Sequence, residues 1–422
     1  MSASRAFSAA HLHALAKRFG TPYYVYDFDV IERQVARLRN ALGRRFELAY
    51  AIKANPALGV LSFLAKRGLG ADVASRGELA AALAAGFPPE RLVATGPAKS
   101  DADLEALVAA GVGQIHVEGP EEMERLEAIG KRARRRIPIG LRLNPPWGIA
   151  ETRTIIGGPG AKKFGFDLAS ARRTLAERDR FPHLDVGGFQ VFNASNVLDA
   201  GLLAENVRRV IDLALSLSRR ADVPLRVIDF GGGFGVPYSD REKPLDLARL
   251  KSDLAIIART AAEEPRLAGA RLVFEPGRFL VAEAGRYVVR VIGTKRSRGV
   301  VYALVDGGVH QLLRPALLGT PHQVQLLAMG RSRATSSREK VVIAGPLCTS
   351  LDILHPGALL PLPRAGELLS IENAGAYGYT ESMPLFLSHE WAAEIGVRQG
   401  RAVLLRRPPR VSEILEAQTT PF

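Results

Sequence analysis

Eight short runs of strand-forming residues alternate with helical patterns between residues 46 and 277, and this alternation restricts the fold more than any other feature. The runs are FELAYAIKA (46–54), GADVAS (70–75), RLVATG (91–96), QIHVEG (114–119), IPIGLRLN (137–144), DVGGFQVF (185–192), LRVIDFGGG (225–233) and ARLVFEPG (270–277). Alternating strands and helices indicate a parallel α/β sheet. Eight evenly spaced units predict a closed (β/α)8 TIM barrel, with a doubly wound open sheet as the competing fold.

The stretches between these runs carry the boundary signals of amphipathic helices. Each begins near Ser, Asp, Gly or Pro, and RGELAAALAAG (76–86) and SDADLEALVAAG (100–111) end at glycine. GPEEMERLEAIG (119–130) opens with Gly-Pro. Such residues are typical of helix starts and stops, so we predict helices in these connections.

Beyond about residue 280, strand patterns follow one another with few helical stretches between them. The runs are YVVRVIGTK (287–295), VYALVDGG (301–308), EKVVIAG (339–345), GELLSIE (366–372) and RAVLLRR (401–407). We therefore predict a barrel at 28–280 and a C-terminal β-sandwich or β-barrel domain at 281–422. Residues 1–27 are expected to form a helix and a strand, TPYYVYD (21–27), that joins the β domain or leads into the barrel.

Length and cysteine content bound the class of protein. A chain of 422 residues with 47% hydrophobic content exceeds the size of a single core, so two domains are expected. Its one cysteine, Cys348, excludes an intrachain disulfide and favours a reducing compartment. The N-terminus lacks the apolar block of a signal peptide, and no segment approaches the ~20 apolar residues of a membrane span. We expect a soluble cytoplasmic protein with no membrane partner.

The chain is strongly basic, with a formal charge of +14 and a pI near 10.1. Nucleic-acid binding would require the basic residues to gather on one face with aromatics between them. Instead they are spread along the chain, and the densest group, KRARRR (131–136), lies at the end of a predicted helix, where it complements the helix dipole. We therefore expect no nucleic-acid partner; an acidic substrate or partner protein suits the charge better. The eight histidines show no metal-ligand spacing, so no metal site is predicted.

The first strand of the predicted barrel ends in a lysine. TIM-barrel active sites form at the C-terminal strand ends, which is where Lys53 lies. Such a lysine either extends its ammonium to the rim or, when desolvated, serves as an amine for carbonyl chemistry. Strand alternation places Ala49, Ala51 and Lys53 on one face, which leaves room beside the amine for a flat group.

The seventh and eighth strands end in GGGFG (231–235) and EPGR (275–278). Glycines there either form a tight turn or let backbone amides cradle a phosphate. The dinucleotide pattern GxGxxG fails because Val236 stands at its last position. A buried Glu275 requires a cation, supplied by Arg278 in a structural pair or by a ligand. A lysine, a glycine cradle and a buried carboxylate together suit the aldehyde, phosphate and ring nitrogen of pyridoxal 5′-phosphate.

Eight motifs resemble, in order, those of the fold-type III pyridoxal-phosphate-dependent decarboxylases, the group that contains diaminopimelate and ornithine decarboxylases. They are YAIKANP, GADVASRGEL, LRLNP, FGGGFG, EPGRFLV, VDGGVHQLLRPAL, GPLCTSLD and ENAGAYGYT. The resemblance covers about residues 20 to 390. It implies an amino-acid decarboxylase that acts through a Schiff base and a quinonoid, as a homodimer with shared active sites.

The resemblance also implies roles for individual residues. Lys53 matches the lysine that forms the Schiff base. Glu275 matches the carboxylate that keeps the cofactor ring protonated, so that the ring accepts the electrons released as carbon dioxide leaves. Cys348 matches a cysteine that protonates the product carbanion across the dimer interface; otherwise it is a small hydrophobe. The other cofactor-binding residues that the resemblance implies are Asp72, Glu78, Arg142, Ser195, Gly231, Gly232, Gly233, Arg278 and Tyr377.

Several positions depart from the family pattern. Phe192 occupies the place of a histidine that stacks on the cofactor ring, and Gln190 has the same parity, so a register slip of two exchanges the two. Thr349 follows the cysteine where members that bind a distal ammonium carry an acidic residue. Leu318 replaces a tyrosine of diaminopimelate decarboxylases. The predicted substrate-binding residues are Arg314, Thr349 and Asp352, and the substrate is expected to be neither diaminopimelate nor ornithine.

The segments CTSLD and FLSH look more like decarboxylases of secondary pathways. These include enzymes of exosortase clusters, of siderophore assembly and of amino acids bound to carrier proteins, and a basic surface suits an acidic carrier protein. The alternatives are a diaminopimelate decarboxylase of lysine biosynthesis, a racemase, and a non-catalytic pyridoxal-phosphate-binding regulator. Glu275 and Cys348 argue against the racemase, and a regulator would be expected to have lost Lys53 or Cys348.

Overall fold

The computed structural model describes residues 5–148, 163–193, 195–329 and 337–420, and the chain forms two compact units. The sheet unit comprises Met1–Gln34, Pro237–Lys243 and Arg278–Phe422; the barrel unit comprises Val35–Val236 and Pro244–Gly277. Residues 28–34 and 278–280, expected in the barrel, are thus grouped with the sheet unit. So is the segment 237–243, an excursion that no sequence pattern indicated.

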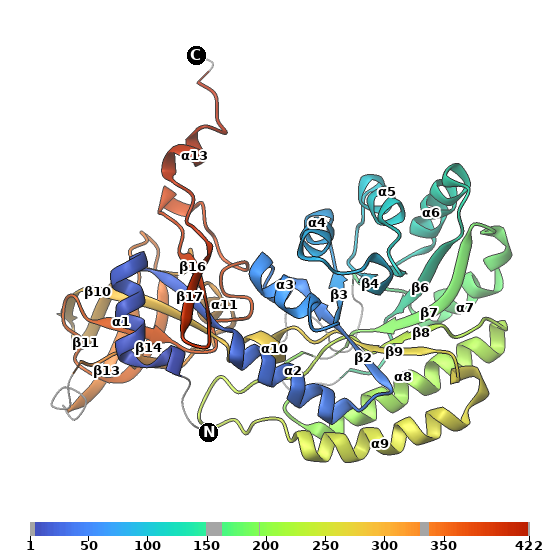
Figure 1. Ribbon diagram of the computed structural model, residues 1–422, viewed down its shortest axis with the longest axis horizontal. Coiled ribbons are helices and arrows are strands. Elements are labelled where there is room, and N and C mark those ends of the chain that lie inside the picture. The colour runs from blue at the N-terminus through green and yellow to red at the C-terminus, as the bar shows by residue number, and fades with distance from the viewer. Residues whose placement is uncertain (1–4, 149–162, 194, 330–336, 421–422) are drawn as a thin grey trace. The chain divides into compact units, whose positions relative to one another are not determined.

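The barrel unit contains a closed eight-stranded parallel barrel, which confirms the TIM-barrel prediction and excludes an open sheet (Figure 1). Its strands, in barrel order, are β2 (Phe46–Ala51), β3 (Gly70–Val73), β4 (Leu92–Ala94), β5 (Gln114–Val117), β6 (Ile137–Leu143), β7 (Leu184–Val191), β8 (Val227–Asp229) and β9 (Arg271–Phe274). Closure is completed by β9, which pairs in parallel with β2. Ala49, Val93, Val227 and Val273 pack together as a buried cluster of strand residues.

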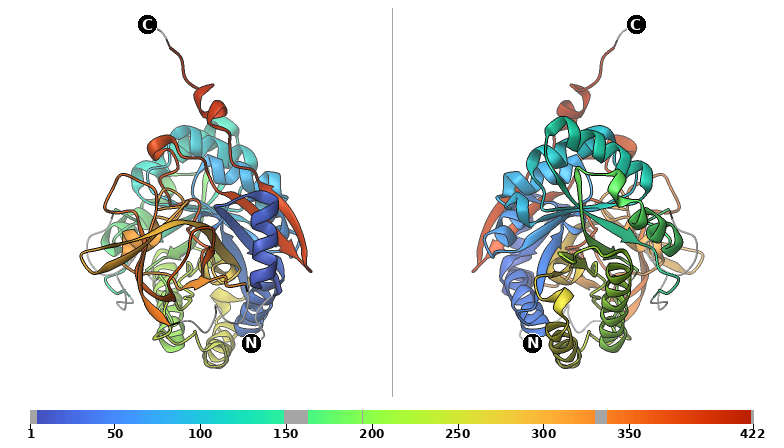
Figure 2. Two further views of the ribbon diagram at one scale, coloured as in Figure 1. Left: turned by 90° about the vertical axis from the view of Figure 1, so that its left-hand side faces the viewer. Right: turned by 90° about the vertical axis from the view of Figure 1, so that its right-hand side faces the viewer.

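Helices surround the strands of the barrel, as the right-hand view of Figure 2 shows. They are α3 (Leu58–Ala65), α4 (Arg76–Ala85), α5 (Asp101–Ala110), α6 (Pro120–Ala133), α7 (Leu168–Ala176), α8 (Ala200–Ala221) and α9 (Leu247–Glu263), with α2 (Phe28–Leu42) leading in from the sheet unit. The predicted boundary signals act as caps. Ser75 accepts a hydrogen bond from the amide of Glu78, Ser100 and Asp103 form a capping box, and α4 ends at Gly86 with φ of 91°.

The first barrel strand is shorter than the sequence indicates. It ends at Ala51, and Ile52–Ala54 form the 3-10 turn η2. The predicted strand face of Ala49, Ala51 and Lys53 therefore does not extend to the lysine. The turn ends at Asn55, because a residue before proline is restricted to extended backbone and because the Asn55 side chain accepts a hydrogen bond from the amide of Ala57 (3.1 Å).

The sheet unit contains nine strands joined in one sheet, so a mostly-sheet domain accompanies the barrel as predicted. The strands are β1 (Tyr23–Asp27), β10 (Gly285–Ser297), β11 (Val300–Val305), β12 (Val324–Leu326), β13 (Arg338–Ala344), β14 (Ile353–Pro361), β15 (Leu368–Ile371), β16 (Ala393–Arg398) and β17 (Arg401–Arg406). The N-terminal strand β1 lies in the middle of this sheet, antiparallel to β10 and parallel to β16. Of its two expected locations, β1 therefore occupies the β domain.

Short helices complete the sheet unit. They are α1 (Ala9–Phe19), α10 (Arg278–Val281), α11 (Arg314–Leu318) and α13 (Val411–Leu415). Helix α1 buries Leu12 and Leu15 against Tyr23, Val288 and Ile395 of the sheet. None of the helices in the described part of the chain combines the length and apolarity that a membrane crossing requires.

Candidate active site

Lys53 lies in the turn η2 at the C-terminal end of β2, where it forms an ion pair with Asp72 of β3. Asp72 is 1% exposed, and its other oxygen accepts a hydrogen bond from the Thr95 hydroxyl at 2.6 Å. The lysine side chain remains 31% exposed. The ion pair thus holds a primary amine at the end of the barrel, within reach of a molecule that enters from solvent.

Glu78 belongs to the same end of the barrel. Its carboxylate accepts a hydrogen bond from the amide of Ala74 at 2.7 Å, across the N-terminus of α4. Burial raises the pKa of Glu78, and the nearby Asp72 charge raises it further, whereas Lys53 lowers it. Glu78 therefore lies within the electrostatic field of the lysine pair, and its place beside the cofactor stays a prediction.

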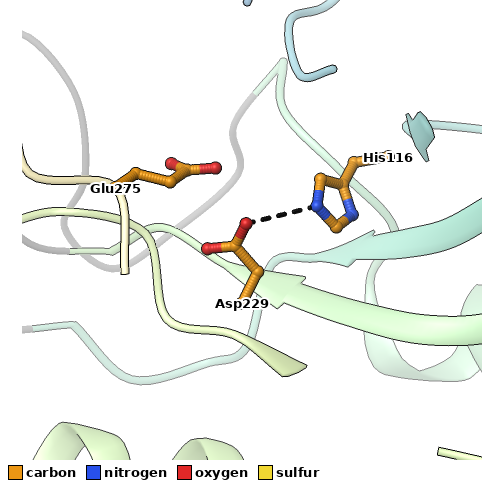
Figure 3. A group of neighbouring side chains, drawn as sticks. All are labelled: His116, Asp229 and Glu275. Atoms are coloured by element: carbon orange, nitrogen blue, oxygen red, sulfur yellow. Dashed lines mark ion pairs between the residues drawn. The ribbon is translucent and has the colours of Figure 1, made fainter. Parts of the chain in front are cut away.

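Three side chains from separate strands meet deeper in the barrel: His116 of β5, Asp229 at the end of β8 and Glu275 just after β9 (Figure 3). The Asp229 carboxylate lies between the other two, with its Oδ2 atom 3.3 Å from His116 Nε2. Glu275 Oε1 accepts a hydrogen bond from Gln190 Nε2 at 2.8 Å. All four residues are at most 3% exposed.

Sequence spacing did not reveal the part that His116 and Asp229 play in this cluster. The ligand atoms of His116, Asp229 and Glu275 lie within 4.8 Å of one another, although their strands are far apart in the chain. Each residue stands near the end of a predicted strand, and barrel closure is what brings them together. Their position near strand ends was the one sequence signal that could have marked His116 and Asp229 as site residues, since catalytic residues of TIM barrels come from several strand ends.

Burial sets the charge state of this cluster. It lowers the pKa of His116 to about 4, so the imidazole is neutral at pH 7. It raises the pKa of Asp229 to about 7 and that of Glu275 well above its ordinary value, with repulsion from Asp229 as the second cause for Glu275. Two buried carboxylates so close together hold a proton or require a cation, which a protonated ring nitrogen supplies.

The glycine loop Gly231–Gly233 follows β8, and its neighbours leave no room for a side chain on Gly231 or Gly232. Gly231 and Gly233 adopt positive φ values of 64° and 99°. A Cβ atom on Gly232 would lie 2.6 Å from the carbonyl oxygen of Glu275. The amide of Val197, two residues beyond Ser195, donates to the Gly233 carbonyl at 2.8 Å, so the predicted phosphate-binding Ser195 belongs to a segment tied to this loop.

Gln190 and Phe192 occupy different surroundings. Gln190 is buried on β7 and contacts Glu275, whereas Phe192 follows the strand and lies against the glycine loop, where its ring fills the space that a Cβ on Gly231 would need. The identity of the side chain that stacks on the cofactor ring stays a prediction.

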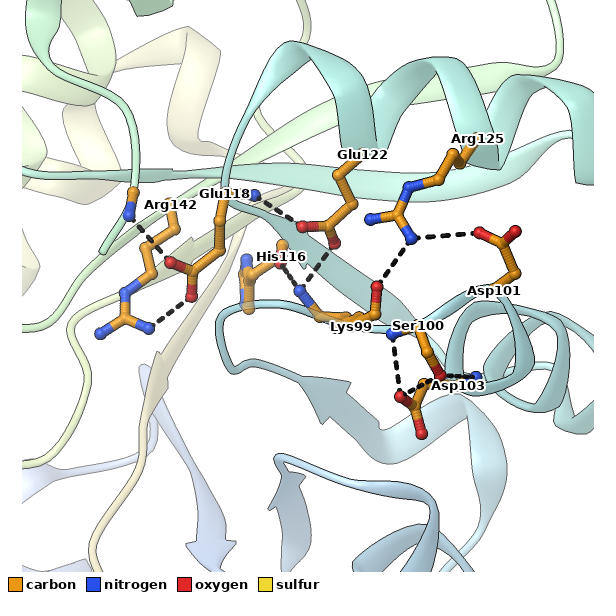
Figure 4. A network of polar contacts seen from close by, with 10 residues as sticks. Lys99, Ser100, Asp101, Asp103, His116, Glu118, Glu122, Arg125 and Arg142 are labelled. Carbon is orange, nitrogen blue, oxygen red and sulfur yellow. Dashed lines mark hydrogen bonds and ion pairs between the residues drawn. The ribbon is translucent and has the colours of Figure 1, made fainter. Parts of the chain in front are cut away.

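Arg142 of β6 is buried, and its guanidinium is paired with Glu118 at 2.6 Å (Figure 4). Glu118 also accepts a hydrogen bond from the amide of Gly165 at 2.8 Å. A second buried pair, Lys99 with Glu122 at 2.7 Å, lies in the same network, and Lys99 donates to the carbonyl of His116. The sequence singled out Arg142 as a cofactor ligand but missed Glu118, the partner that fixes its position.

Replacing Glu118 with glutamine is expected to lower the free energy of unfolding by about 3–5 kcal/mol, because it leaves the buried Arg142 guanidinium without its counter-charge. Urea denaturation of the two proteins measures the difference. The matched control is Glu121→Gln on the exposed face of α6, for which a change within about 0.5 kcal/mol is expected. Equal losses in both variants would contradict a structural role for the pair.

In the sheet unit, Arg278 is 7% exposed and contacts two tyrosines. Its Nη1 atom donates to the Tyr238 hydroxyl at 2.8 Å, and its guanidinium lies 4.8 Å from the centre of the Tyr377 ring. Among the described residues, no carboxylate lies within ion-pair distance of this guanidinium. A buried cation without a carboxylate fits an anionic ligand, and the structure groups it with Tyr377 as the sequence predicted.

Cys348 is exposed on the loop between β13 and β14. The base of this loop is held by Asp352, which is 2% exposed and accepts hydrogen bonds from the amides of Val309 and Leu347, each at 2.7 Å. Gly308 and Gly345 make room for this carboxylate, since a Cβ on either would lie 2.4 Å from one of its oxygens. These contacts favour Asp352 as a support of the cysteine loop over the predicted substrate contact.

The residues of the barrel unit fit pyridoxal 5′-phosphate. An accessible amine suits an aldehyde, the glycine loop suits a phosphate, and a buried carboxylate pair suits a protonated ring nitrogen. The buried Oδ2 of Asp229 and Oε1 of Gln190 have no hydrogen-bond partner among the described residues, as expected at a site built for a polar ligand.

Comparison with known proteins agrees with this chemistry. A family model described as "Pyridoxal-dependent decarboxylase, pyridoxal binding domain" matches residues 28–282. L-glutamyl-[BtrI acyl-carrier protein] decarboxylase of Niallia circulans is 31% identical over 413 residues, 97% of this chain and 96% of that protein. Diaminopimelate decarboxylase of Deinococcus radiodurans is 36% identical, with 96% and 98% covered. The crystal structure of diaminopimelate decarboxylase from Helicobacter pylori complexed with L-lysine has a TM-score of 0.87 at 27% identity, covering 96% of this chain and 98% of that chain.

The similarity to these decarboxylases extends over nearly the whole length of this chain and of each relative. The family model covers every candidate residue of the barrel cluster. The cofactor is pyridoxal 5′-phosphate, and the activity is that of an amino-acid decarboxylase. The chain belongs to the pyridoxal-dependent decarboxylases.

Proposed function

We propose that this chain decarboxylates an amino acid whose far end is held as an acyl group on an acidic carrier protein. The observation that carries the proposal is Thr349, an uncharged residue beside Cys348. Decarboxylases of this family that bind a distal ammonium resemble one another in having an acidic residue there. A substrate with no distal ammonium has no need of it.

The loop around Cys348 contains no other carboxylate that could bind a distal ammonium in place of the missing acidic residue. Residues 345–352, GPLCTSLD, contain one acidic side chain, and that is Asp352. Both of its oxygens accept backbone amides at the base of the loop. The Thr349 hydroxyl accepts a hydrogen bond from the amide of Leu351 at 3.2 Å. The polar groups of the loop therefore stabilise the loop itself.

The site also lacks an available cation for a substrate with a free distal carboxylate. Arg314, the residue predicted to bind it, is 8% exposed and already paired with Glu381 at 2.7 Å. Its guanidinium also lies 5.0 Å from the centre of the Tyr377 ring. A substrate with an uncharged acyl end, such as a thioester, requires neither a carboxylate to bind a distal ammonium nor an arginine to bind a distal carboxylate. The relative from Niallia circulans is named for a glutamyl group on an acyl-carrier protein.

The net charge of +14 supports a macromolecular substrate of opposite sign. Basic proteins attract acidic partners over long distances, which raises the rate of encounter. The homodimer implied by the family resemblance stays a prediction, as does donation of a proton by Cys348 across its interface.

Pyridoxal 5′-phosphate, when bound, supplies an aldehyde for the substrate amine and a protonated ring that takes up the electron pair left by carbon dioxide. Lys53 provides the amine that anchors the cofactor, and Asp72 orients that amine. Glu275 holds the proton at the ring nitrogen. The Cys348 thiol would deliver a proton to the carbon from which carbon dioxide leaves.

The holoenzyme is expected to remove carbon dioxide from a glutamyl carrier protein with kcat/KM at least about 100-fold above that for free glutamate, diaminopimelate or ornithine, because remote contacts raise kcat/KM. Mass spectrometry of the intact carrier and of the free amino acids measures both reactions. Turnover of a free amino acid without turnover of any aminoacyl carrier would contradict the proposal. Turnover of diaminopimelate in particular would establish the runner-up, which the 36% identity to a diaminopimelate decarboxylase favours.

Thr349→Asp is the matched variant for this experiment. It restores a carboxylate beside Cys348, and a charge-assisted hydrogen bond contributes about 1.5–3 kcal/mol, or about 10–150-fold in kcat/KM. Relative activity on free diamino acids is therefore expected to rise. Ser350→Asp adds the same charge at the neighbouring exposed position and is expected to change the preference little.

A further inference from the structure

Asp229 is the centre of a buried hydrogen-bond arrangement that the family chemistry does not use. Its Oδ1 atom accepts a hydrogen bond from the amide of Gly231 at 2.8 Å, and its Oδ2 atom lies 3.3 Å from His116 Nε2. Strand pairing also sets Asp229 directly beside Gln190, the residue that donates to Glu275. Asp229 thus links the glycine loop, the histidine and the cluster that contains Glu275.

The barrel has space for this arrangement because two glycines provide it. A Cβ on Gly140 would lie 2.9 Å from His116 Nδ1, and a Cβ on Gly188 would lie 2.7 Å from Gln114 Nε2. His116 and Asp229 are 0% exposed, and both ring nitrogens of His116 and the Oδ2 atom of Asp229 have no hydrogen-bond partner among the described residues. Glycines on β6 and β7 thus leave room for the side chains of His116 and Gln114 inside the barrel.

The charges near the cluster do not neutralise both carboxylates. The charged side chains whose fields act on His116, Asp229 or Glu275 are Lys53, Asp72, Lys99 and Arg142. Each of the three cations has its own carboxylate partner: Lys53 with Asp72, Lys99 with Glu122, and Arg142 with Glu118. None of these cations is therefore available to neutralise Asp229 or Glu275.

We infer that Asp229 and Glu275 share one proton in the cofactor-free protein, and that the Gly231 amide holds Asp229 as the ionised member beside the polar ring of His116, so that Glu275 carries the proton. When a cofactor ring enters, the O–H bond of Glu275 breaks and an N–H bond forms at the ring nitrogen. The pair then carries one more negative charge and the ring one more positive charge, so no proton comes from water. This last step rests on the proposed contact between Glu275 and the ring nitrogen.

The donors decide which carboxylate is ionised. Asp229 accepts the backbone amide of Gly231, which the glycine loop fixes in place, and lies 3.3 Å from His116 Nε2 without a hydrogen bond between them. Glu275 accepts the side-chain amide of Gln190. Donors stabilise a carboxylate anion, so the proton resides on the less supported group. The raised pKa values of both carboxyls agree with this assignment. His116 and Asp229 are accordingly positioning residues that act through Glu275.

Infrared difference spectroscopy of the cofactor-free protein tests the shared proton. At pH 7 the wild type is expected to show the carbonyl band of a protonated carboxylic acid, shifted in heavy water, and Glu275→Gln is expected to lack it. In Asp229→Asn the pH midpoint of the band is expected to fall by roughly one to three units, because the neighbouring negative charge is removed. His116→Phe is expected to raise the midpoint, and His116→Gln, which retains an N–H donor, to restore it.

Glu78→Gln removes a different carboxyl with a raised pKa and is the control in which the band must persist. Absence of the band in the wild type, or a band insensitive to both Glu275→Gln and Asp229→Asn, would overturn the inference. Addition of pyridoxal 5′-phosphate then separates the two claims. Loss of the band on binding supports transfer to the ring, whereas binding that leaves the band intact refutes the Glu275 contact and leaves the shared proton standing.

Discussion

Replacing Lys53 with alanine is expected to abolish the borohydride-stable adduct with pyridoxal 5′-phosphate and to lower kcat/KM by at least about 10³-fold, toward the upper end of what a single proton-transfer group contributes. The reason is geometric. Lys53 is the primary amine at the end of β2, oriented by Asp72 and open to solvent on one side. Mass spectrometry of the reduced, digested protein locates the adduct, and carbon dioxide release measures the rate.

Two variants control this experiment. Lys53→Arg retains a cation beside Asp72, so it is expected to preserve folding while still failing to form the adduct, because a guanidinium does not condense with the aldehyde under these conditions. Lys66→Ala removes an exposed lysine after α3 and is expected to leave both measurements unchanged. An adduct that persists in Lys53→Ala on another lysine would contradict the assignment of the anchor.

The barrel was predictable because its local signals agree with its global fold. Each of the eight apolar runs coincides with one barrel strand, although β7 begins one residue before its run, and the glycines at 86 and 111 end helices α4 and α5. Strand ends were less predictable, since the residues after a strand share its apolar character. The run LRVIDFGGG suggested a strand at 225–233, whereas β8 spans Val227–Asp229. Closure decides where pairing stops, and closure is not a local property.

Three strands of the sheet unit were missed for reasons that lie in their residues. β14 contains Pro356 and Gly357, which normally argue against a strand interior. β16 contains Glu394, a residue type that indicates a surface position, yet it is 1% exposed. The Tyr26 hydroxyl donates to it at 2.6 Å, and Arg406 pairs with it. β12 has three residues, too few for any periodicity.

Candidate site residues were found where a motif is contiguous and missed where it is not. Lys53, the glycine loop and Glu275 each lie in short motifs. Glu118, His116 and Asp229 acquire their partners from other strands, so their partners are defined by barrel closure alone. For Arg142 the sequence motif suggested a cofactor ligand, which stays a prediction, and the fold adds a buried partner that the motif did not indicate.

Replacing Glu275 with glutamine is expected to lower kcat/KM by about 10²–10³-fold, the loss typical of removing one preorganised electrostatic partner. An amide does not hold the ring nitrogen in its protonated form, so the ring accepts electrons less readily. Carbon dioxide release by the fully loaded variant measures the effect. The control is Glu90→Gln, an exposed site next to β4, for which no change is expected.

The same substitution is expected to change how the stability of the cofactor-free protein depends on pH. Asp229 and Glu275 have folded-state pKa values above their unfolded values of about 3.9 and 4.3. Their contribution to the free energy of unfolding is therefore complete below pH 4 and is lost as the pH rises through about 7, the pKa of Asp229. His116, whose pKa is lowered to about 4, acts in the opposite sense, since its contribution is lost as the pH falls from about 6.5 toward 4.

Glu275→Gln removes one carboxylate of the pair and with it the repulsion that opposes ionisation of the other. Urea denaturation at pH 5.5 and pH 8 is therefore expected to show a smaller loss of stability toward alkaline pH in this variant than in the wild type. In both folded proteins His116 is neutral across that window, because removing the Glu275 charge lowers its pKa further. Its titration in the unfolded state is the same in both proteins, so the difference between them reports on the carboxylate pair. An identical alkaline loss in both proteins would show that Glu275 neither titrates with a raised pKa nor affects the titration of Asp229, and the charge assignment of the barrel cluster would fail with it.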